Sequence, residues 1–126
     1  MTIGYSSILI YLLISYAFVA YAKFARAGYD NQQPRIYLNS LSGKAQRAHW
    51  AHQNSLEAMA PFCAGVIIAH LVGLNQVYLD TAALTFCGLR LLYGYFYIQN
   101  LSKLRSLAWA LALILNIYLL SGGFWS

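Results

Sequence analysis

The feature that most constrains this chain is a series of four long apolar stretches separated by short polar ones. They cover approximately residues 3–27, 45–72, 77–99 and 104–120. A helix that crosses a bilayer needs about 20 consecutive, mostly apolar residues, and each stretch is close to that length. We therefore expect an all-α integral membrane protein built as a four-helix bundle.

The composition argues against an ordinary soluble domain. The 126 residues are 60% hydrophobic and 9% charged, whereas a soluble domain carries about 25% charged residues. Four spans and their loops use up the sequence, so we expect a single domain over residues 1–126. The first stretch begins near Met1 without a basic leading region or a small-residue cleavage site, and we expect it to be retained rather than removed as a signal peptide.

Basic residues are concentrated around two of the three expected loops. Those at the first loop are Lys23, Arg26, Arg35, Lys44 and Arg47, and those at the third are Lys103 and Arg105. Cytoplasmic loops attract Lys and Arg, so we expect loops one and three in the cytoplasm and both termini on the opposite side. This bias accounts for the net charge of +5, and no nucleic-acid partner is expected.

Two of the stretches carry polar side chains at helical spacing. They are Arg47, Asn54 and Glu57 in the second stretch, and Arg90, Tyr93 and Tyr97 in the third. Spacings of three, four and seven residues place each set on one helix face. A charge near the centre of a membrane helix costs at least about 2.5 kcal/mol, so such groups usually face a bundle interior or a cavity. The two faces together predict a pocket for a polar, anionic small molecule near the basic end.

Glu57 and Arg90 are the strongly charged residues deepest in their stretches, and their charges are opposite. Because an unpaired charge there would be costly, we expect the two side chains to form an ion pair. A purely stabilising pair would explain these two residues, but it would not account for Asn54, Tyr93 and Tyr97. The three histidines, His49, His52 and His70, are too scattered to predict a metal site.

The second stretch also contains a specific motif. The run Ala51-His52-Gln53-Asn54-Ser55-Leu56-Glu57, followed by Pro61-Phe62, resembles the second-helix signature of the MAPEG family, the membrane-associated proteins of eicosanoid and glutathione metabolism. It looks most like the microsomal glutathione transferase branch. Arg90, Tyr93 and Tyr97 are similar to the third-helix pattern of that family, and Leu104-Arg105-Ser106 resembles the start of its fourth helix.

The resemblance implies a homotrimer that binds glutathione between neighbouring protomers near the cytoplasmic face, with no metal. Carried over by position, Arg105 would be the catalytic residue that stabilises the glutathione thiolate. The residues lining the glutathione site would be Arg47, Asn54, Glu57, Arg90, Tyr93 and Tyr97. The activity implied is a glutathione transferase or peroxidase whose lipophilic second substrate enters from the membrane lipid.

Two other interpretations remain open at this stage. Strongly active members of the family have an arginine four residues before the asparagine, whereas this chain has Trp50. That difference favours a non-catalytic relative that binds a lipid or a glutathione-like ligand without turnover. A small transporter or channel subunit would instead require a polar face that continues to the far membrane surface, and here the polar residues stop around Glu57 and Arg90.

Overall fold

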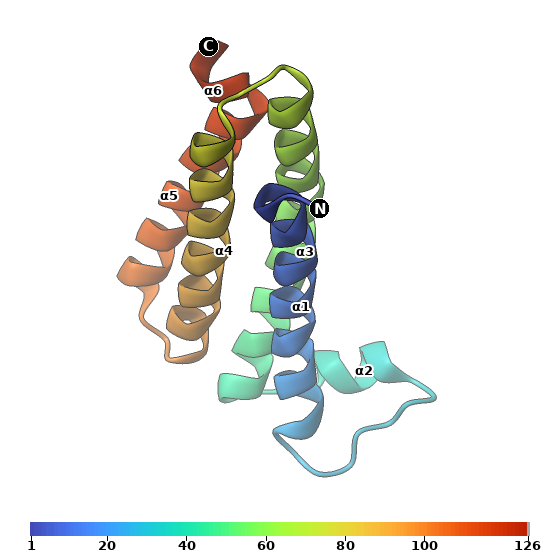
Figure 1. Cartoon of the computed structure of the whole chain (residues 1–126). Helices are drawn as coiled ribbons and strands as arrows, with labels where there is room; N and C mark the ends of the chain where they lie inside the picture. Colours follow the sequence, from blue (N-terminus) through green and yellow to red (C-terminus); the bar gives the residue numbers. More distant parts are fainter. Residues whose placement is uncertain (126) are drawn as a thin grey trace.

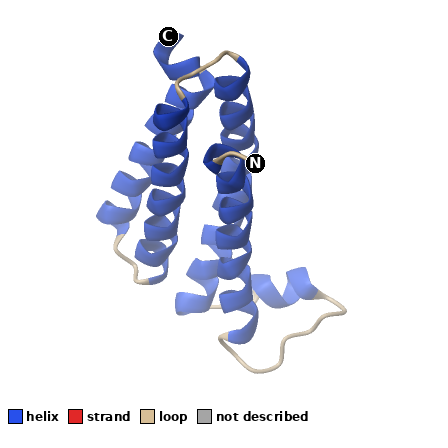
Figure 2. Cartoon of the chain, in the orientation of Figure 1, coloured by secondary structure: helices blue, strands red, loops and turns tan. Residues whose placement is uncertain are grey.

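The computed structural model describes residues 1–125, which form helices joined by loops and turns (Figure 2). The four long helices are α1 (Ile3–Phe24), α3 (Gly43–Leu71), α4 (Gln76–Ile98) and α5 (Ser102–Leu120). A short helix α2 (Pro34–Asn39) precedes α3, and a short irregular turn, α6 (Gly122–Trp125), follows α5. The expected all-α four-helix bundle is therefore confirmed.

The directions of the long helices indicate how many of them cross the membrane. By length and composition, α1, α3 and α5 are apolar enough to span a bilayer. Helix α4 carries Asp80 and Arg90 and does not meet the same criterion. Figure 1 shows, however, that α3 and α5 run in the same direction and that α4 returns between them through two short turns. If α3 and α5 both cross the membrane, α4 has to cross it as well.

The loops alternate between the two ends of the bundle. The loops over residues 25–33 and 99–101 lie at one end, and the turn over residues 72–75 lies at the other, with the C-terminal segment (Figure 1). The basic residues of loops one and three are thus gathered at a common end, as their distribution predicts. That this end faces the cytoplasm remains a prediction.

Helix α2 lies where the sequence analysis expected only a polar loop. Pro34 occupies the start of this helix, where its missing N–H costs nothing. Tyr37 and Leu38 are buried, and the Tyr37 hydroxyl donates a 3.0 Å hydrogen bond to the Arg26 carbonyl at the end of α1. This short helix, which packs against the bundle, was not predicted because the residues around it are typical of turns.

An aromatic cluster holds α1, α3 and α4 together near their middle. The rings of Phe62 and Phe86 stack at 4.1 Å between centroids, and the Tyr11 ring packs edge-on against both. Tyr11 is fully buried, and its hydroxyl donates a 2.6 Å hydrogen bond to the Ser55 carbonyl. This bond fixes the position of α1 along α3.

Two further contacts fix α1 against α4. At the start of α1, the backbone N–H of Gly4 donates to the Asp80 carboxylate of α4 at 2.8 Å, and a negative charge is favourable at a helix N-terminus. Further along, α4 comes so close to α1 at Gly94 that a Cβ atom there would lie 1.9 Å from the Phe18 ring. Glycine is thus required at position 94 by packing.

This close approach can be tested with a pair of alanine substitutions in the same helix. Gly94→Ala should lower the stability of the detergent-solubilised protein by about 1–3 kcal/mol, because the added methyl group forces Phe18 out of place. Gly88→Ala is the matched control, since a Cβ atom at Gly88 meets no atom within 4 Å. Thermal unfolding of both variants measures the difference, and equal melting temperatures would contradict the packing described.

Candidate functional site

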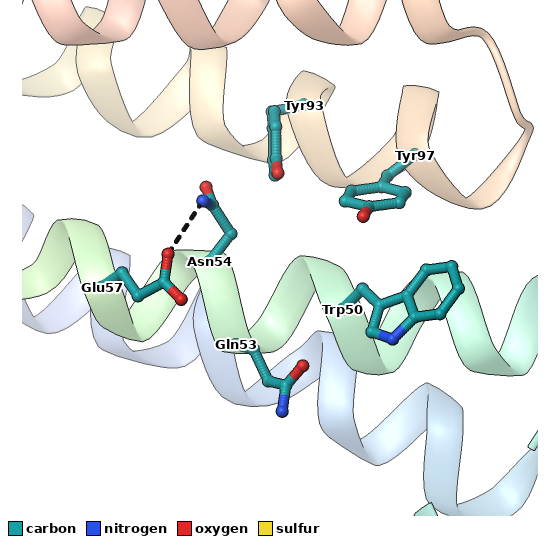
Figure 3. Close-up of a pocket in the computed structure, with 6 residues that line it drawn as sticks. All are labelled: Trp50, Gln53, Asn54, Glu57, Tyr93 and Tyr97. Atoms are coloured by element: carbon teal, nitrogen blue, oxygen red, sulfur yellow. Dashed lines mark hydrogen bonds between the residues drawn. The ribbon is translucent and has the colours of Figure 1, made fainter. Parts of the chain in front are cut away.

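A cleft lies between α3, α4 and α5 in the half of the bundle nearest the loop over residues 99–101. It has two compartments that share three residues, Asn54, Tyr93 and Tyr97. The larger, of about 440 Å³, is completed by Trp50, Gln53 and Glu57 (Figure 3). The smaller, of about 220 Å³, is completed by Arg105, Ser106 and Trp109. We call the two together the α3–α5 cleft.

The aromatic wall of the cleft comes from successive turns of α4. Tyr93 and Tyr97 both project toward α3 (Figure 3), and their rings meet edge-to-face at 5.6 Å. The Arg105 guanidinium, from the first turn of α5, lies over the Tyr97 ring at 4.5 Å from its centroid. A cation held against an aromatic face in this way is positioned without being neutralised, so Arg105 presents a positive charge to the cleft.

A chain of hydrogen bonds runs from the core to the mouth of the cleft. The Arg90 Nη2 group donates to Asn54 Oδ1 at 2.8 Å, and Asn54 Nδ2 donates to Glu57 Oε2 at 3.2 Å (Figure 3). The prediction of a direct Glu57–Arg90 ion pair is therefore wrong. The register of α3 against α4 brings Asn54, rather than Glu57, opposite the guanidinium, and the amide links the two charges.

Arg90 itself is buried behind the cleft. Its side chain is 1% exposed, its guanidinium lies 4.1 Å from the centre of the Tyr93 ring, and Nη2 is also 3.5 Å from the Ser55 hydroxyl oxygen. The bond from Arg90 fixes the orientation of the Asn54 amide, because it engages the carbonyl oxygen and turns the NH₂ group toward Glu57. Arg90 thus positions cleft residues from behind.

Arg47 is, with Arg90, one of the two predicted site residues that do not line the cleft. Its Nε donates to the Ile98 carbonyl at 3.1 Å, at the end of α4, where a positive charge is favoured by the helix dipole. The other predicted residues lie where the sequence analysis expected them to gather. Asn54, Glu57, Tyr93, Tyr97 and Arg105 line the cleft, and Arg90 supports them.

The structure adds four lining residues that the sequence analysis did not assign to the site. Ser106 and Trp109 follow Arg105 on α5, and Gln53 precedes Asn54 on α3. Trp109 could have been predicted from the sequence, because a residue four positions after Arg105 lies on the same face of the helix. Trp50, where the resemblance would expect an arginine, lies 6.3 Å from the Tyr97 ring and forms the aromatic floor of the larger compartment.

The chemical character of the cleft follows from these groups. It offers a carboxylate, two amides, two phenol hydroxyls, a serine hydroxyl and one guanidinium within a space large enough for a small peptide-like molecule. This set suits a ligand that has both an amino group and anionic groups. Within residues 1–125, no group of three or more His, Cys, Asp or Glu side chains is arranged to hold a metal ion.

The hydrogen-bond chain predicts which pairs of residues are energetically coupled. In a double-mutant cycle, Asn54→Ala and Arg90→Met should be coupled by about 0.5–3 kcal/mol, since the two side chains are in direct contact. Glu57→Gln and Arg90→Met should be coupled more weakly, because these two side chains are connected only through Asn54. Unfolding of the four single and double variants in detergent measures both quantities. A larger coupling for Glu57 than for Asn54 would contradict the amide-linked arrangement.

Among the comparisons with known proteins, the one with family models gives a match. The MAPEG family model matches residues 2–125, nearly the whole chain. Neither a curated protein nor a solved structure matches the sequence. With its bundle of long apolar helices and its polar cleft between the last three of them, the chain belongs to the MAPEG family of integral membrane proteins, which act in eicosanoid and glutathione metabolism.

Proposed function

We propose that this protein is a membrane-bound glutathione transferase of the microsomal type, which converts glutathione to its thiolate for attack on lipophilic electrophiles. The observation that carries the proposal is the convergence of Asn54, Tyr93, Tyr97 and Arg105 on one cleft from three different helices. Most members of the family are glutathione-dependent enzymes, and the groups in this cleft match the chemistry of that tripeptide.

The charges of glutathione match the charged groups around the cleft. The tripeptide has one amino group and two carboxylates. The Glu57 carboxylate, whose exposed side faces the larger compartment, can accept hydrogen bonds from the amino group. Arg47 uses only Nε in its bond to Ile98, which leaves its two Nη groups free to bind a carboxylate at the rim in a bidentate manner. Arg90 orients the Asn54 amide, and that amide in turn holds the Glu57 carboxylate in place.

Arg105 is the residue we assign to the chemical step. A thiolate, not a thiol, is the nucleophile, and a nearby guanidinium favours the thiolate form. The thiol proton leaves to solvent, the sulfur electron pair forms a bond to an electrophilic carbon, and the leaving group departs with the bonding electrons. With a lipid hydroperoxide, the same thiolate would attack the distal oxygen and form a sulfenic acid, and the alkoxide would leave and take up a proton from solvent to become the alcohol. A second glutathione would then attack the sulfenic sulfur and form the disulfide, with release of water.

The second substrate would arrive through the membrane. Trp109, which lines the smaller compartment, is 44% exposed, and Leu113, one turn further along the same face of α5, is exposed as well. This side of α5 is apolar up to the edge of the cleft. A hydrophobic electrophile dissolved in the bilayer would therefore meet Trp109 first and reach the sulfur beside Arg105.

A homotrimer would complete the site. Glu57 lies at the middle of α3, and both it and Gln53 are exposed in the single chain. Ionisable and amide groups at that depth are costly when they face lipid. A neighbouring copy packed over this edge of α3 would cover them and close the larger compartment, which is the assembly that the family resemblance implies.

Trp50 supports a second candidate function. The indole occupies the place of a cation that would bind a carboxylate, and it packs on Tyr97 inside the larger compartment. A protein with this floor would bind a lipid or a glutathione-like ligand in the same cleft without turning it over. Saturable glutathione binding in the absence of conjugation would favour this function over the transferase.

The catalytic assignment is tested by removing the guanidinium. Arg105→Ala should lower kcat for conjugation of glutathione to a chlorodinitrobenzene-type electrophile by about 10²- to 10³-fold, the usual effect of losing one preorganised electrostatic contact to the reacting charge. Lys103→Ala, which removes an equal charge from an exposed position in the first turn of the same helix, should retain activity. Equal rates for Arg105→Ala and the unmodified protein would exclude the assigned role.

The role of Trp50 can be tested in the opposite direction, by restoring a cation. Trp50→Arg should tighten glutathione binding about tenfold, because a hydrogen bond between charged groups contributes about 1.5–3 kcal/mol. Trp50→Phe is the control, since it keeps an aromatic ring and adds no charge. Titration calorimetry measures both affinities. Weaker binding by Trp50→Arg would show that the indole itself contacts the bound tripeptide.

A further inference from the structure

Tyr11 of α1 is a buried polar residue that the proposed reaction does not use. Its side chain is fully buried, and no residue of α1 lines either compartment of the α3–α5 cleft. Figure 1 shows, however, that α1 runs alongside α3. The Tyr11 hydroxyl donates its 2.6 Å hydrogen bond to the carbonyl of Ser55, the residue that follows Asn54. A helix outside the cleft thus contacts the segment of α3 that forms one wall of the cleft.

Helix α1 holds this segment of α3 at two points one turn apart. The first is the bond from Tyr11 to Ser55. The second joins His52 Nδ1 to the Ser15 carbonyl oxygen at 2.7 Å, and because a carbonyl can only accept, the imidazole donates. Ser15 and Ser55 are fully buried and His52 is buried as well, so water does not compete for these bonds. Asn54 lies in the sequence between the two residues that α1 holds.

The guanidinium of Arg90 depends on the same segment of α3. Its Nη2 group is 2.8 Å from Asn54 Oδ1 and 3.5 Å from the Ser55 hydroxyl oxygen, so its two acceptors are neighbours in the sequence. Within residues 1–125, the Arg90 Nε group has no hydrogen-bond partner. A shift of α3 at this height would displace both acceptors together. Hydrogen bonds weaken steeply when their geometry is distorted, so the Asn54 amide and the Glu57 carboxylate that it contacts would lose their orientation.

We infer that Tyr11 is a positioning residue of the α3–α5 cleft, because its hydroxyl holds α3 in the register at which Arg90 reaches Asn54. Since Tyr11 is fully buried outside the cleft, it contacts neither the ligand nor the reacting atoms. Its effect is on binding, because groups that are already oriented lose less freedom when a ligand arrives. This role rests on the proposed function, in which the cleft binds glutathione.

Tyr11→Phe tests this role, because it removes the hydroxyl and keeps the ring in its cluster with Phe62 and Phe86. The Kd for glutathione, measured by titration calorimetry, should rise about fivefold, the size expected when one net hydrogen bond is lost. With a chlorodinitrobenzene-type electrophile, the KM for glutathione should rise in parallel. The kcat should change by less than about twofold, since Arg105 is not part of this chain of bonds and only binding is weakened.

Tyr37→Phe is the matched control. Tyr37 is also buried, and its hydroxyl likewise donates to a backbone carbonyl, that of Arg26 at 3.0 Å, but neither residue lines the cleft. Both variants should lose some thermal stability in detergent, and only Tyr11→Phe should lose glutathione affinity. An equal loss of affinity in both variants would overturn the inference, because it would indicate a general loosening of the bundle. So would a Kd for Tyr11→Phe equal to that of the unmodified protein.

A measurement without glutathione separates this role from the proposed function on which it rests. In protein labelled with ¹⁵N-asparagine, the side-chain amide signal of Asn54 is assigned by its absence from Asn54→Ala. This signal should shift in Tyr11→Phe and stay in place in Tyr37→Phe, and an unchanged signal in Tyr11→Phe would overturn the inference. If the unmodified protein binds no glutathione, the proposed function fails, and the Asn54 signal alone decides whether Tyr11 positions the cleft.

Discussion

Arg90 carries a full positive charge at 1% exposure inside a bundle of membrane helices, and the surrounding structure is arranged to accommodate it. A charge at such a depth costs at least about 2.5 kcal/mol unless it is paired or hydrogen-bonded. Here the guanidinium packs on the Tyr93 ring, and its Nη2 group donates to Asn54. Asn54 in turn donates to Glu57. The contacts that stabilise the Arg90 charge in the core therefore also orient the Asn54 and Glu57 side chains at the cleft.

Two adjacent faces of α3 differ in chemistry. On one side, Asn54 and Glu57 face α4 and α5 and form a cleft with a guanidinium at one end and a carboxylate at the other. On the adjacent face, His49 and His52 line a pocket with α1 and α2 whose charged residues are basic, and Gln53 borders both pockets.

Much of this could be predicted from the sequence, because apolar run length determines the spans and helical spacing determines the faces. The ends of the four long helices lie within three residues of the expected limits. What could not be predicted depends on contacts between helices. Opposite charges suggested a Glu57–Arg90 pair, but the register of α3 against α4 selects Asn54 as the partner of Arg90. The burial of His49 likewise depends on α2, a helix hidden among turn-forming residues.

A structure determined with bound glutathione tests the central claim most directly. The account predicts the tripeptide in the α3–α5 cleft, with its sulfur beside the Arg105 guanidinium and its amino group beside Glu57. Glutathione bound elsewhere on the protein, or bound in the cleft with its sulfur turned away from Arg105, would contradict it.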